Sequence, residues 1–204
     1  MKVYKIGLVG CGRIGTLLEK DKLRGGPCTH AGGFNALSNT KIVAGCDIDR
    51  SRLKAFGMHW GVNRLYEDYL EMLHQEKLDV VCVATWTNLH ASMVMDAARS
   101  GVKAIFCEKP IALNPHDGRQ MVRFCKKRNV PLIINHERRW DSYYQKASQI
   151  IKTGKIGEIR TIVGNALSSK PGKHPTRSHG GGALFHDGTH LIDLFLNFGG
   201  PVEW

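Results

Sequence analysis

The sequence predicts a doubly wound α/β domain over residues 1–135, followed by the opening part of an α+β domain over residues 136–204. Short apolar runs alternate with longer segments of helical periodicity, and each run is apolar throughout rather than at every second position. Strands of that kind, separated by helices, form parallel sheets that are buried on both faces. A glycine-rich turn directly after the first apolar run is the third observation.

The apolar runs define the expected strands, and the segments between them define the expected helices. The predicted strands are 4–10, 41–48, 79–85, 102–109 and 130–135. The predicted helices lie near 13–20, 51–58, 66–75, 88–99 and 115–128. Asn88 and the pair Asn114-Pro115 are the expected N-terminal caps of the last two helices.

The composition is that of a soluble globular protein, with 42% hydrophobic and 23% charged residues in 204. The apolar runs are too short to span a bilayer, and the first one leads into a glycine turn rather than a signal-peptide cleavage site. We therefore expect a cytoplasmic protein with no membrane partner. The six cysteines include no C-x-x-C pair, which favours free thiols in a reducing compartment.

The formal net charge of +11, from 29 basic and 18 acidic residues, favours an anionic partner. Nucleic-acid binding would require clustered basic residues interleaved with aromatic ones. The dense basic clusters are confined to residues 126–128 and 137–140. The charge therefore indicates a nucleotide or an acidic metabolite rather than a nucleic acid.

The stretch GLVGCGRIG places the pattern G-x-G-x-x-G directly after the first predicted strand. Gly10 would permit a tight turn, Gly12 would let a pyrophosphate approach the backbone, and Gly15 would let helix and strand pack closely. The amides that follow would face the phosphates, so Arg13 and Ile14 join the predicted cofactor-binding residues. The pattern and its position predict a dinucleotide site.

Asp47 ends the second predicted strand, where a carboxylate would bind the ribose hydroxyls of NAD and repel the 2′-phosphate of NADP. Its distance from the glycines is longer than usual, because residues 20–30 have the composition of an inserted loop. Arg50 and Arg52 lie close by and could accept a phosphate, so NADP stays open as an alternative to NAD. A second alternative is that Asp47 only caps the following helix.

Further motifs follow in order at the ends of later strands: ATWTNLH (84–90), CEKP (107–110), NHERRW (135–140) and GGGALFHDGTHLIDL (180–194). With the glycine turn, they make the chain resemble the glucose–fructose oxidoreductase/inositol dehydrogenase (Gfo/Idh/MocA) family from about Lys2 to its end. The resemblance implies a Rossmann domain and hydride transfer between a nicotinamide cofactor and a hydroxyl-bearing carbon. It implies a sugar, a cyclitol or a related polyol as the substrate.

The resemblance assigns the catalytic lysine of E-K-P to Lys109, with Glu108 beside it in the cofactor-binding set. Hydride transfer at a hydroxyl carbon needs a proton moved on or off the oxygen, and a lysine near the positively charged nicotinamide suits that task. Thr85, Asn88 and His90 are expected cofactor or substrate contacts, although His90 could instead be a helix residue without a ligand.

The motifs ATWTNLH and NHERRW each contain a feature whose role the resemblance does not decide. Trp86 stands where the family usually has proline, and would place a large flat side chain near the cofactor. Arg138 and Arg139 in NHERRW would face the substrate and bind a carboxylate or phosphate, unless they pair with the following helix. That helix is expected over 141–154 with Gly154 at its end, and a strand is expected over 157–167.

The run HDGTH departs from the family pattern. The resemblance places His190 on the family histidine and Asp193 on the trailing aspartate, but it puts His186 where an acid usually stands. Asp187 comes one residue late. On a helix both His186 and Asp187 could share a face with His190, so we expect His190 as the main acid–base group and substrate contact, then His186, then Asp187.

A zinc site is the alternative for the same histidines, with His174 or His179 as the third ligand. A zinc site would not explain the dinucleotide-binding motif. Gly188 also weakens the helix on which the two zinc-binding histidines would have to lie. We therefore expect no metal.

The resemblance also implies a large, mostly antiparallel second domain whose sheet forms dimers or tetramers. After the first domain, the 204 residues hold one strand-like segment and one helix. This predicts a second domain that is truncated or that a partner completes. Homo-oligomerisation through that sheet is the expected interaction. Two other functions stay open, namely a glycosidase-like member with a transient redox cofactor and a non-catalytic NAD-binding sensor or partner subunit.

Overall fold

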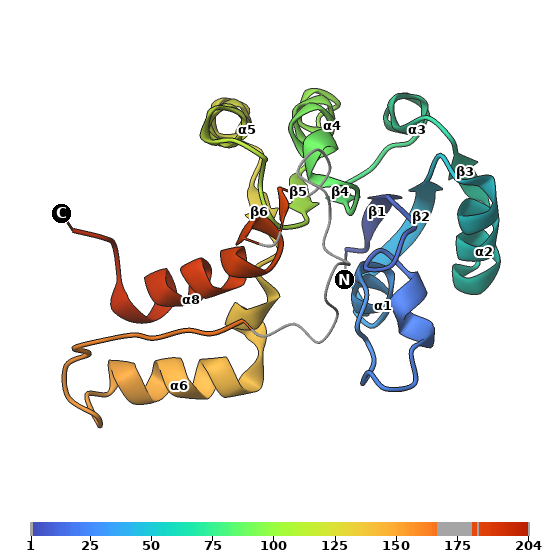
Figure 1. Ribbon diagram of the computed structural model, residues 1–204. Helices are drawn as coiled ribbons and strands as arrows, with labels where there is room; N and C mark the ends of the chain where they lie inside the picture. The colour runs from blue at the N-terminus through green and yellow to red at the C-terminus, as the bar shows by residue number, and fades with distance from the viewer. Residues whose placement is uncertain (1, 167–180, 183, 204) are drawn as a thin grey trace. The chain divides into compact units, whose positions relative to one another are not determined.

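A computed structural model describes residues 2–166, 181–182 and 184–203 (Figure 1). The chain forms two compact units, Met1–Ile134 and Asn135–Trp204. The six cysteines are all free. Among the described residues, no helix combines the length and the hydropathy needed to cross a membrane.

The first unit is built on a parallel six-stranded sheet in the order β3-β2-β1-β4-β5-β6. The strands are β1 (Tyr4–Val9), β2 (Thr40–Cys46), β3 (Arg64–Tyr66), β4 (Val80–Val83), β5 (Ala104–Cys107) and β6 (Leu132–Ile134). The predicted doubly wound parallel sheet is therefore confirmed. Strand β3 escaped the sequence analysis because its three residues, RLY, contain no apolar run. The order reverses between β1 and β4, where ligands of open α/β sheets bind.

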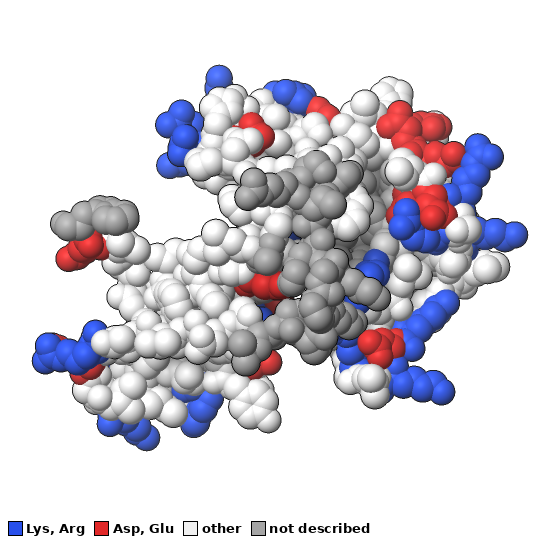
Figure 2. All heavy atoms as spheres, viewed as in Figure 1, with Lys and Arg blue, Asp and Glu red and all other residues white. Residues whose placement is uncertain are grey.

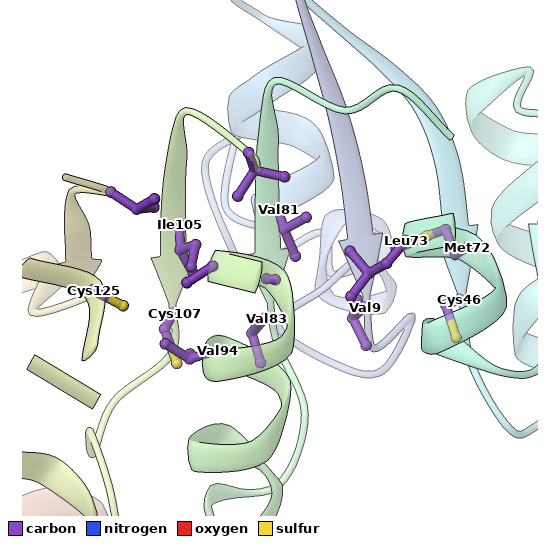
Figure 3. Close-up of a cluster of buried hydrophobic side chains, with 14 of the residues drawn as sticks. Val9, Cys46, Met72, Leu73, Val81, Val83, Val94, Ile105, Cys107 and Cys125 are labelled. Carbon is purple, nitrogen blue, oxygen red and sulfur yellow. The ribbon is translucent and has the colours of Figure 1, made fainter. Parts of the chain in front are cut away.

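Two hydrophobic clusters cover the two faces of the sheet, because successive strand residues point to opposite sides. Val81 and Val83 of β4 join the larger cluster, whereas Cys82 between them joins the smaller one. Helices α3 (Tyr69–Gln75), α4 (Thr87–Arg99) and α5 (Pro115–Lys127) close the larger cluster, part of which is drawn in Figure 3. Helices α1 (His30–Asn35) and α2 (Arg50–Trp60) close the smaller one.

The helix predicted over 13–20 is wrong in its extent. Residues 13–16 form a turn, η1 (Leu17–Lys20) is a short 3-10 helix, and α1 begins only at His30. The amides of His30 and Ala31 donate to the carbonyl oxygens of Ile14 and Gly15, both at 3.0 Å. The inserted loop therefore interrupts the first helix instead of following it, and these hydrogen bonds join its two parts.

The two predicted caps have different outcomes. The side chain of Asn114 accepts from the amide of Asp117, so the cap of α5 is confirmed. The cap predicted at Asn88 is wrong, because α4 begins at Thr87 with Trp86 as its N-cap residue in extended conformation. Asn88 consequently lies in the first turn of the helix, and its side chain is exposed.

The second unit is helical in its described part. It contains η2 (Glu137–Trp140), α6 (Ser142–Lys152), a π-helical turn at Leu184–Gly188, labelled η3, and α8 (Thr189–Gly199). Tyr144 of α6 and Phe198 of α8 bring their rings to 6.4 Å between centroids. Gly154, with φ of 69°, follows α6 as expected.

The strand predicted over 157–167 is wrong for its described part. Residues 157–166 have no strand assignment, and Leu167 lies outside the described residues. A strand exists only through hydrogen bonds to a neighbour. No strand lies in the described part of the second unit, so this segment has no partner there.

Lysine and arginine side chains form several separate groups on the face seen in Figure 2, with acidic side chains between them. Lys126 and Lys127 end helix α5, as the sequence predicted for the basic cluster there. Such a helix end suits cations, because the last carbonyl groups carry partial negative charge.

Candidate functional site

The glycine turn between β1 and η1 depends on the absence of side chains at two of its three glycines. Gly10 has φ of +98°, and a Cβ atom there would lie 2.5 Å from the carbonyl oxygen of Ala84. A Cβ on Gly15 would lie 2.1 Å from the carbonyl oxygen of Gly10. A Cβ on Gly12 would meet nothing within 4 Å. Gly10 and Gly15 are therefore required by the fold, whereas Gly12 borders open space.

The amides beside that open space are unused donors. Those of Gly12, Arg13 and Ile14 donate to no group in the part of the chain that the structure describes. The amides at the start of a helical turn have no acceptor within the turn and carry partial positive charge. This arrangement suits a bound phosphate. It is formed by residues that the sequence predicted to bind the cofactor.

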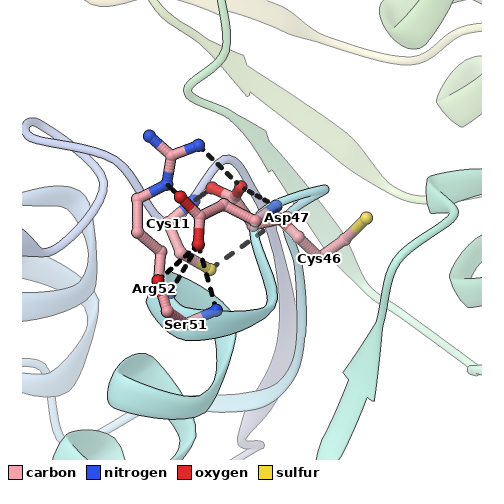
Figure 4. Close-up of polar contacts among 6 residues, drawn as sticks. Cys11, Cys46, Asp47, Ser51 and Arg52 are labelled. Atoms are coloured by element: carbon pink, nitrogen blue, oxygen red, sulfur yellow. Dashed lines mark hydrogen bonds and ion pairs between the residues drawn. The ribbon is translucent and has the colours of Figure 1, made fainter.

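Asp47 follows β2 and lies beside the glycine turn (Figure 4). Its Oδ2 accepts from the amide of Cys11 at 2.8 Å, and its Oδ1 accepts from the amide of Asp49 at 2.8 Å. Arg52 Nη2 lies 3.2 Å from Oδ1. The cap of α2 is Asp49, whose side chain accepts from Ser51 and Arg52. Asp47 is thus held as a carboxylate against the glycine turn and is not the helix cap.

The loop after β4 brings together Thr85 and Trp86, but it does not expose His90. Trp86 is 55% exposed and Thr85 is half-buried, so both are accessible. His90 is 0% exposed, and its ring lies between two backbone carbonyls, with Nδ1 3.0 Å from Pro110 O and Nε2 3.2 Å from Thr85 O. The expectation that His90 contacts a ligand is therefore wrong. Its ring joins two loops instead.

Glu108 and Lys109 follow β5, and the Lys109–Pro110 peptide bond is cis. Glu108 is buried, and its amide donates to Val83 O at 2.9 Å. Its Oε1 lies 2.8 Å from His30 Nε2, while its Oε2 accepts from the amide of Lys109 at 3.2 Å. Lys109 is half-buried. His30 was not predicted from the sequence, because nothing in the HAGGF stretch indicates a partner 78 residues away.

Several interactions act on the pKa of His30. Burial lowers it, but interactions with the Cys82 sulfur and the Glu108 carboxylate raise it by more, to about 10. The ring is therefore an imidazolium at neutral pH, and it forms a buried ion pair with Glu108.

We expect this ion pair to make the stability of the protein fall as the pH rises. The pKa of His30 is about 10 in the folded chain and near the ordinary 6.5 in the unfolded chain, so the folded state holds the extra proton between these values. The stabilisation is complete below pH 6.5 and is lost towards pH 10. The free energy of unfolding should fall by up to about 1.4 kcal/mol per pH unit.

Urea unfolding between about pH 6.5 and pH 7.5, below the pKa of about 8.5 near which unfolded cysteines ionise, would measure this slope. The variant His30→Gln should flatten it, because glutamine does not titrate. Equal slopes in the two proteins would show that His30 is not charged in the folded state.

In the second unit, the structure buries His190 and Asp193 of α8. His190 Nδ1 lies 3.5 Å from Glu137 Oε2. Glu137 belongs to NHERRW, and the sequence analysis did not assign it a role. His186 and Asp187 lie in the π-helical turn, with His186 Nε2 3.9 Å from Asp187 Oδ1. HDGTH spans the π-helical turn and the start of α8, and the carboxylate found beside His190 is Glu137.

Arg139 binds within the protein rather than facing a ligand. Its Nε and Nη2 each donate to one carboxylate oxygen of Asp193 at 2.8 Å. The expectation that Arg139 binds substrate is therefore wrong, as is the alternative of a salt bridge to the following helix. A bidentate pair satisfies both groups. Arg138 is half-buried, and its substrate role stays a prediction.

We expect Arg139→Ala to destabilise the second unit. Asp193 has a side chain only 10% exposed, and it would lose two hydrogen bonds on truncation of its partner. Leaving a buried acceptor unsatisfied costs about 1–3 kcal/mol. The control is Arg160→Ala, because the Arg160–Glu158 pair has side chains 87% and 84% exposed. Its loss should cost less than about 0.5 kcal/mol in urea unfolding. Equal effects of the two substitutions would contradict the assigned role of Arg139.

The metal alternative gains no support from the described residues, which contain no group of three His, Cys, Asp or Glu side chains placed to hold an ion. His174 and His179, the candidate third ligands, lie outside the described residues.

Comparison with known protein families decides the identity of both units. Residues 4–136 match the model of an oxidoreductase family with an NAD-binding Rossmann fold, and residues 144–204 match that of the GFO/IDH/MocA C-terminal domain. The chain belongs to the Gfo/Idh/MocA family. The resemblance drawn from the motifs is confirmed, and the first unit is the NAD-binding Rossmann domain of this family.

Several Gfo/Idh/MocA proteins are similar in sequence. A D-apiose dehydrogenase of Paraburkholderia graminis is 37% identical over 77% of the chain and 38% of the relative. A myo-inositol 2-dehydrogenase of Thermotoga maritima is 31% identical over 78% of the chain and 43% of the relative. The chain thus spans less than half the length of these two relatives.

Solved structures of the family show the same fold. The WlbA dehydrogenase of Bordetella pertussis, in complex with NADH and UDP-GlcNAcA, is 26% identical with a TM-score of 0.81 over 99% of the chain and 57% of that protein. A scyllo-inositol dehydrogenase of Lactobacillus casei, with bound NAD(H) and scyllo-inositol, is 26% identical with a TM-score of 0.68. It matches 77% of the chain and 43% of its own length.

Proposed function

We propose that this chain takes part in NAD-dependent hydride transfer at a hydroxyl or carbonyl carbon of a sugar, cyclitol or related polyol. One observation carries the proposal. The free amides at Gly12–Ile14, the buried carboxylate of Asp47 and Lys109 all lie on loops that leave the carboxyl ends of β1, β2 and β5. This edge of a parallel sheet is where dinucleotides bind.

The cofactor would be held by the backbone and by one carboxylate. The amides of Gly12, Arg13 and Ile14 are available to its pyrophosphate, and Gly12 leaves room for it. Asp47 would accept from the ribose hydroxyls. Because Arg52 lies against Asp47 and Asp49, its charge is already balanced, which supports NAD over NADP. Bound nicotinamide supplies a hydride acceptor or donor at C4.

The proton would be moved by side chains of the CEKP and HDGTH motifs. Lys109 is the proposed acid–base group of the first unit. His190 is the proposed partner in the second, where Glu137 lies close enough to orient its ring and stabilise its charged form. His186 and Asp187 follow as second and third candidates, and Arg138 is a proposed substrate contact.

The substrate class comes from the similar proteins. The two relatives described above are named for D-apiose and for myo-inositol, which are polyhydroxylated compounds. We propose that the substrate of this chain is of the same class, that the protein works in the cytoplasm, where its six free thiols would stay reduced, and that it forms homo-oligomers.

The test is a calorimetric titration of the 204-residue chain with NADH and, separately, with NADPH, after any cofactor already bound has been measured. Tight NADH binding and much weaker NADPH binding would support the proposal. A screen of D-apiose, myo-inositol and scyllo-inositol with NAD would follow, read at the absorbance of NADH. If the folded protein, free of bound cofactor, bound neither NADH nor NADPH, the proposal would be contradicted. Binding without turnover would favour an NAD-binding sensor.

A further inference from the structure

Lys109 lies in a segment without regular secondary structure, between the end of β5 at Cys107 and the start of α5 at Pro115. Regular backbone hydrogen bonds therefore do not fix its position. A catalytic group that is misplaced by about 1 Å can lose a factor of about 100 in rate. The contacts of its neighbours Glu108 and Pro110 therefore contribute to the placement of Lys109.

On one side, Glu108 joins Lys109 to the first helix. One carboxylate oxygen lies 2.8 Å from His30 Nε2, and the other accepts from the amide of Lys109 at 3.2 Å. The side chains of His30 and Glu108 are 5% and 8% exposed, so water competes little for these contacts. His30 also lies edge-on to Phe106 of β5, with ring centroids 5.4 Å apart. The carboxylate is therefore held in one orientation by a buried partner.

On the other side, His90 of α4 binds Pro110. Burial lowers the pKa of His90, so the ring is neutral at pH 7 and donates a single proton. We assign that proton to Nδ1, which lies 3.0 Å from the carbonyl oxygen of Pro110. The ring is completely buried, so its role is internal to the protein.

We propose that His30 and His90 are positioning residues that hold Glu108–Lys109–Pro110 from its two sides and so set the place of the Lys109 amine. The proposal rests on the proposed function of Lys109. Neither histidine touches the cofactor or the substrate in this role. Removing the His30 side chain would take away the imidazolium that holds one oxygen of the buried Glu108 carboxylate, and the carboxylate would turn towards another donor. The ammonium group of Lys109 is on the neighbouring residue.

The test compares a disruptive and a conservative variant at each position. His30→Leu and His90→Leu remove the contacts. His30→Gln keeps a nitrogen donor near the place of Nε2, and His90→Asn keeps one near the place of Nδ1. The first measurement is the rate at which acetic anhydride acetylates Lys109 in the whole chain. It does not require turnover. Mass spectrometry would give this rate relative to that of the exposed Lys54.

The leucine variants should change the relative acetylation rate of Lys109 by at least about threefold, and the Gln and Asn variants should restore most of it. With a polyol substrate, the leucine variants should lower kcat about 100-fold while KM and the Kd of NADH stay within about threefold. Folded leucine variants with an unchanged acetylation rate of Lys109 would overturn the proposal.

If His30→Leu does not fold, Glu108→Gln takes its place, since it removes the ion pair with His30 while keeping the shape of the side chain. Unchanged acetylation of Lys109 in that variant would also overturn the proposal. Failure of the proposed function would give different experimental results from failure of the positioning role. In that case Lys109→Met would keep full turnover, or NADH would not bind, while the acetylation of Lys109 would still report whether the histidines position it.

Discussion

The variant Gly12→Val is expected to lose most of its affinity for NADH while keeping the stability of the wild type. A Cβ atom at this position meets nothing within 4 Å, so the folded chain has room for the side chain. The same space is where the pyrophosphate of the cofactor would approach the free amides. Forcing extra carbon atoms into a contact costs about 1–3 kcal/mol, which is roughly a 5- to 150-fold loss of affinity. Calorimetric titration with NADH measures this loss.

Two other glycines give matched controls. At Gly33 in α1 a Cβ also meets nothing within 4 Å, so Gly33→Val should bind NADH as the wild type does. At Gly15 a Cβ would lie 2.1 Å from the carbonyl oxygen of Gly10, so Gly15→Val should lose stability first. Undiminished NADH binding by Gly12→Val would mean that the cofactor does not approach the turn at Gly12.

The variant Lys109→Met is expected to lower turnover with a polyol about 100- to 10,000-fold, the range that a positioned acid–base group contributes. Methionine keeps much of the length and apolar character of the side chain but cannot carry a proton. The fold should be retained, because Lys109 is only half-buried and Glu108 would still reach His30. NADH affinity should change much less than kcat. Steady-state kinetics and calorimetry on the same preparation separate the two effects.

Lys54→Met in α2 is the control, since Lys54 is an exposed lysine on a helix surface. It should leave both turnover and NADH affinity unchanged. If Lys109→Met kept the turnover of the wild type, the E-K-P lysine would have no part in proton transfer in this chain.

The predictions from sequence agree best with the structure where a feature depends only on residues that are close together in the chain. Strand runs such as VVCV are apolar throughout because they are buried on both faces, and the structure places them in the centre of the sheet. Asn114 caps α5 because a side chain three residues away from an amide can reach it without any other part of the fold. The requirement for Gly10 likewise follows from the turn itself, whose φ is +98°.

The errors at His90 and Arg139 have a common cause in contacts between residues far apart in the chain. His90 was predicted to face a ligand, but two backbone carbonyls surround it, one of them on Pro110. Arg139 was predicted to bind substrate, but its Nε and Nη2 donate to Asp193, 54 residues away. Neither partner could be found from spacing, because each pair meets only once the helices have packed.

The sequence by itself therefore determined the order of the elements, the parallel sheet, the glycine turn and the membership of Lys109 and His190 in two family motifs. These follow from hydrophobic periodicity and from residues whose role depends on their immediate neighbours. Tertiary structure alone decided which polar side chains are used internally. The pairs His30–Glu108 and Arg139–Asp193 form across 78 and 54 residues because a buried or half-buried charge must find a partner wherever the packed fold supplies one.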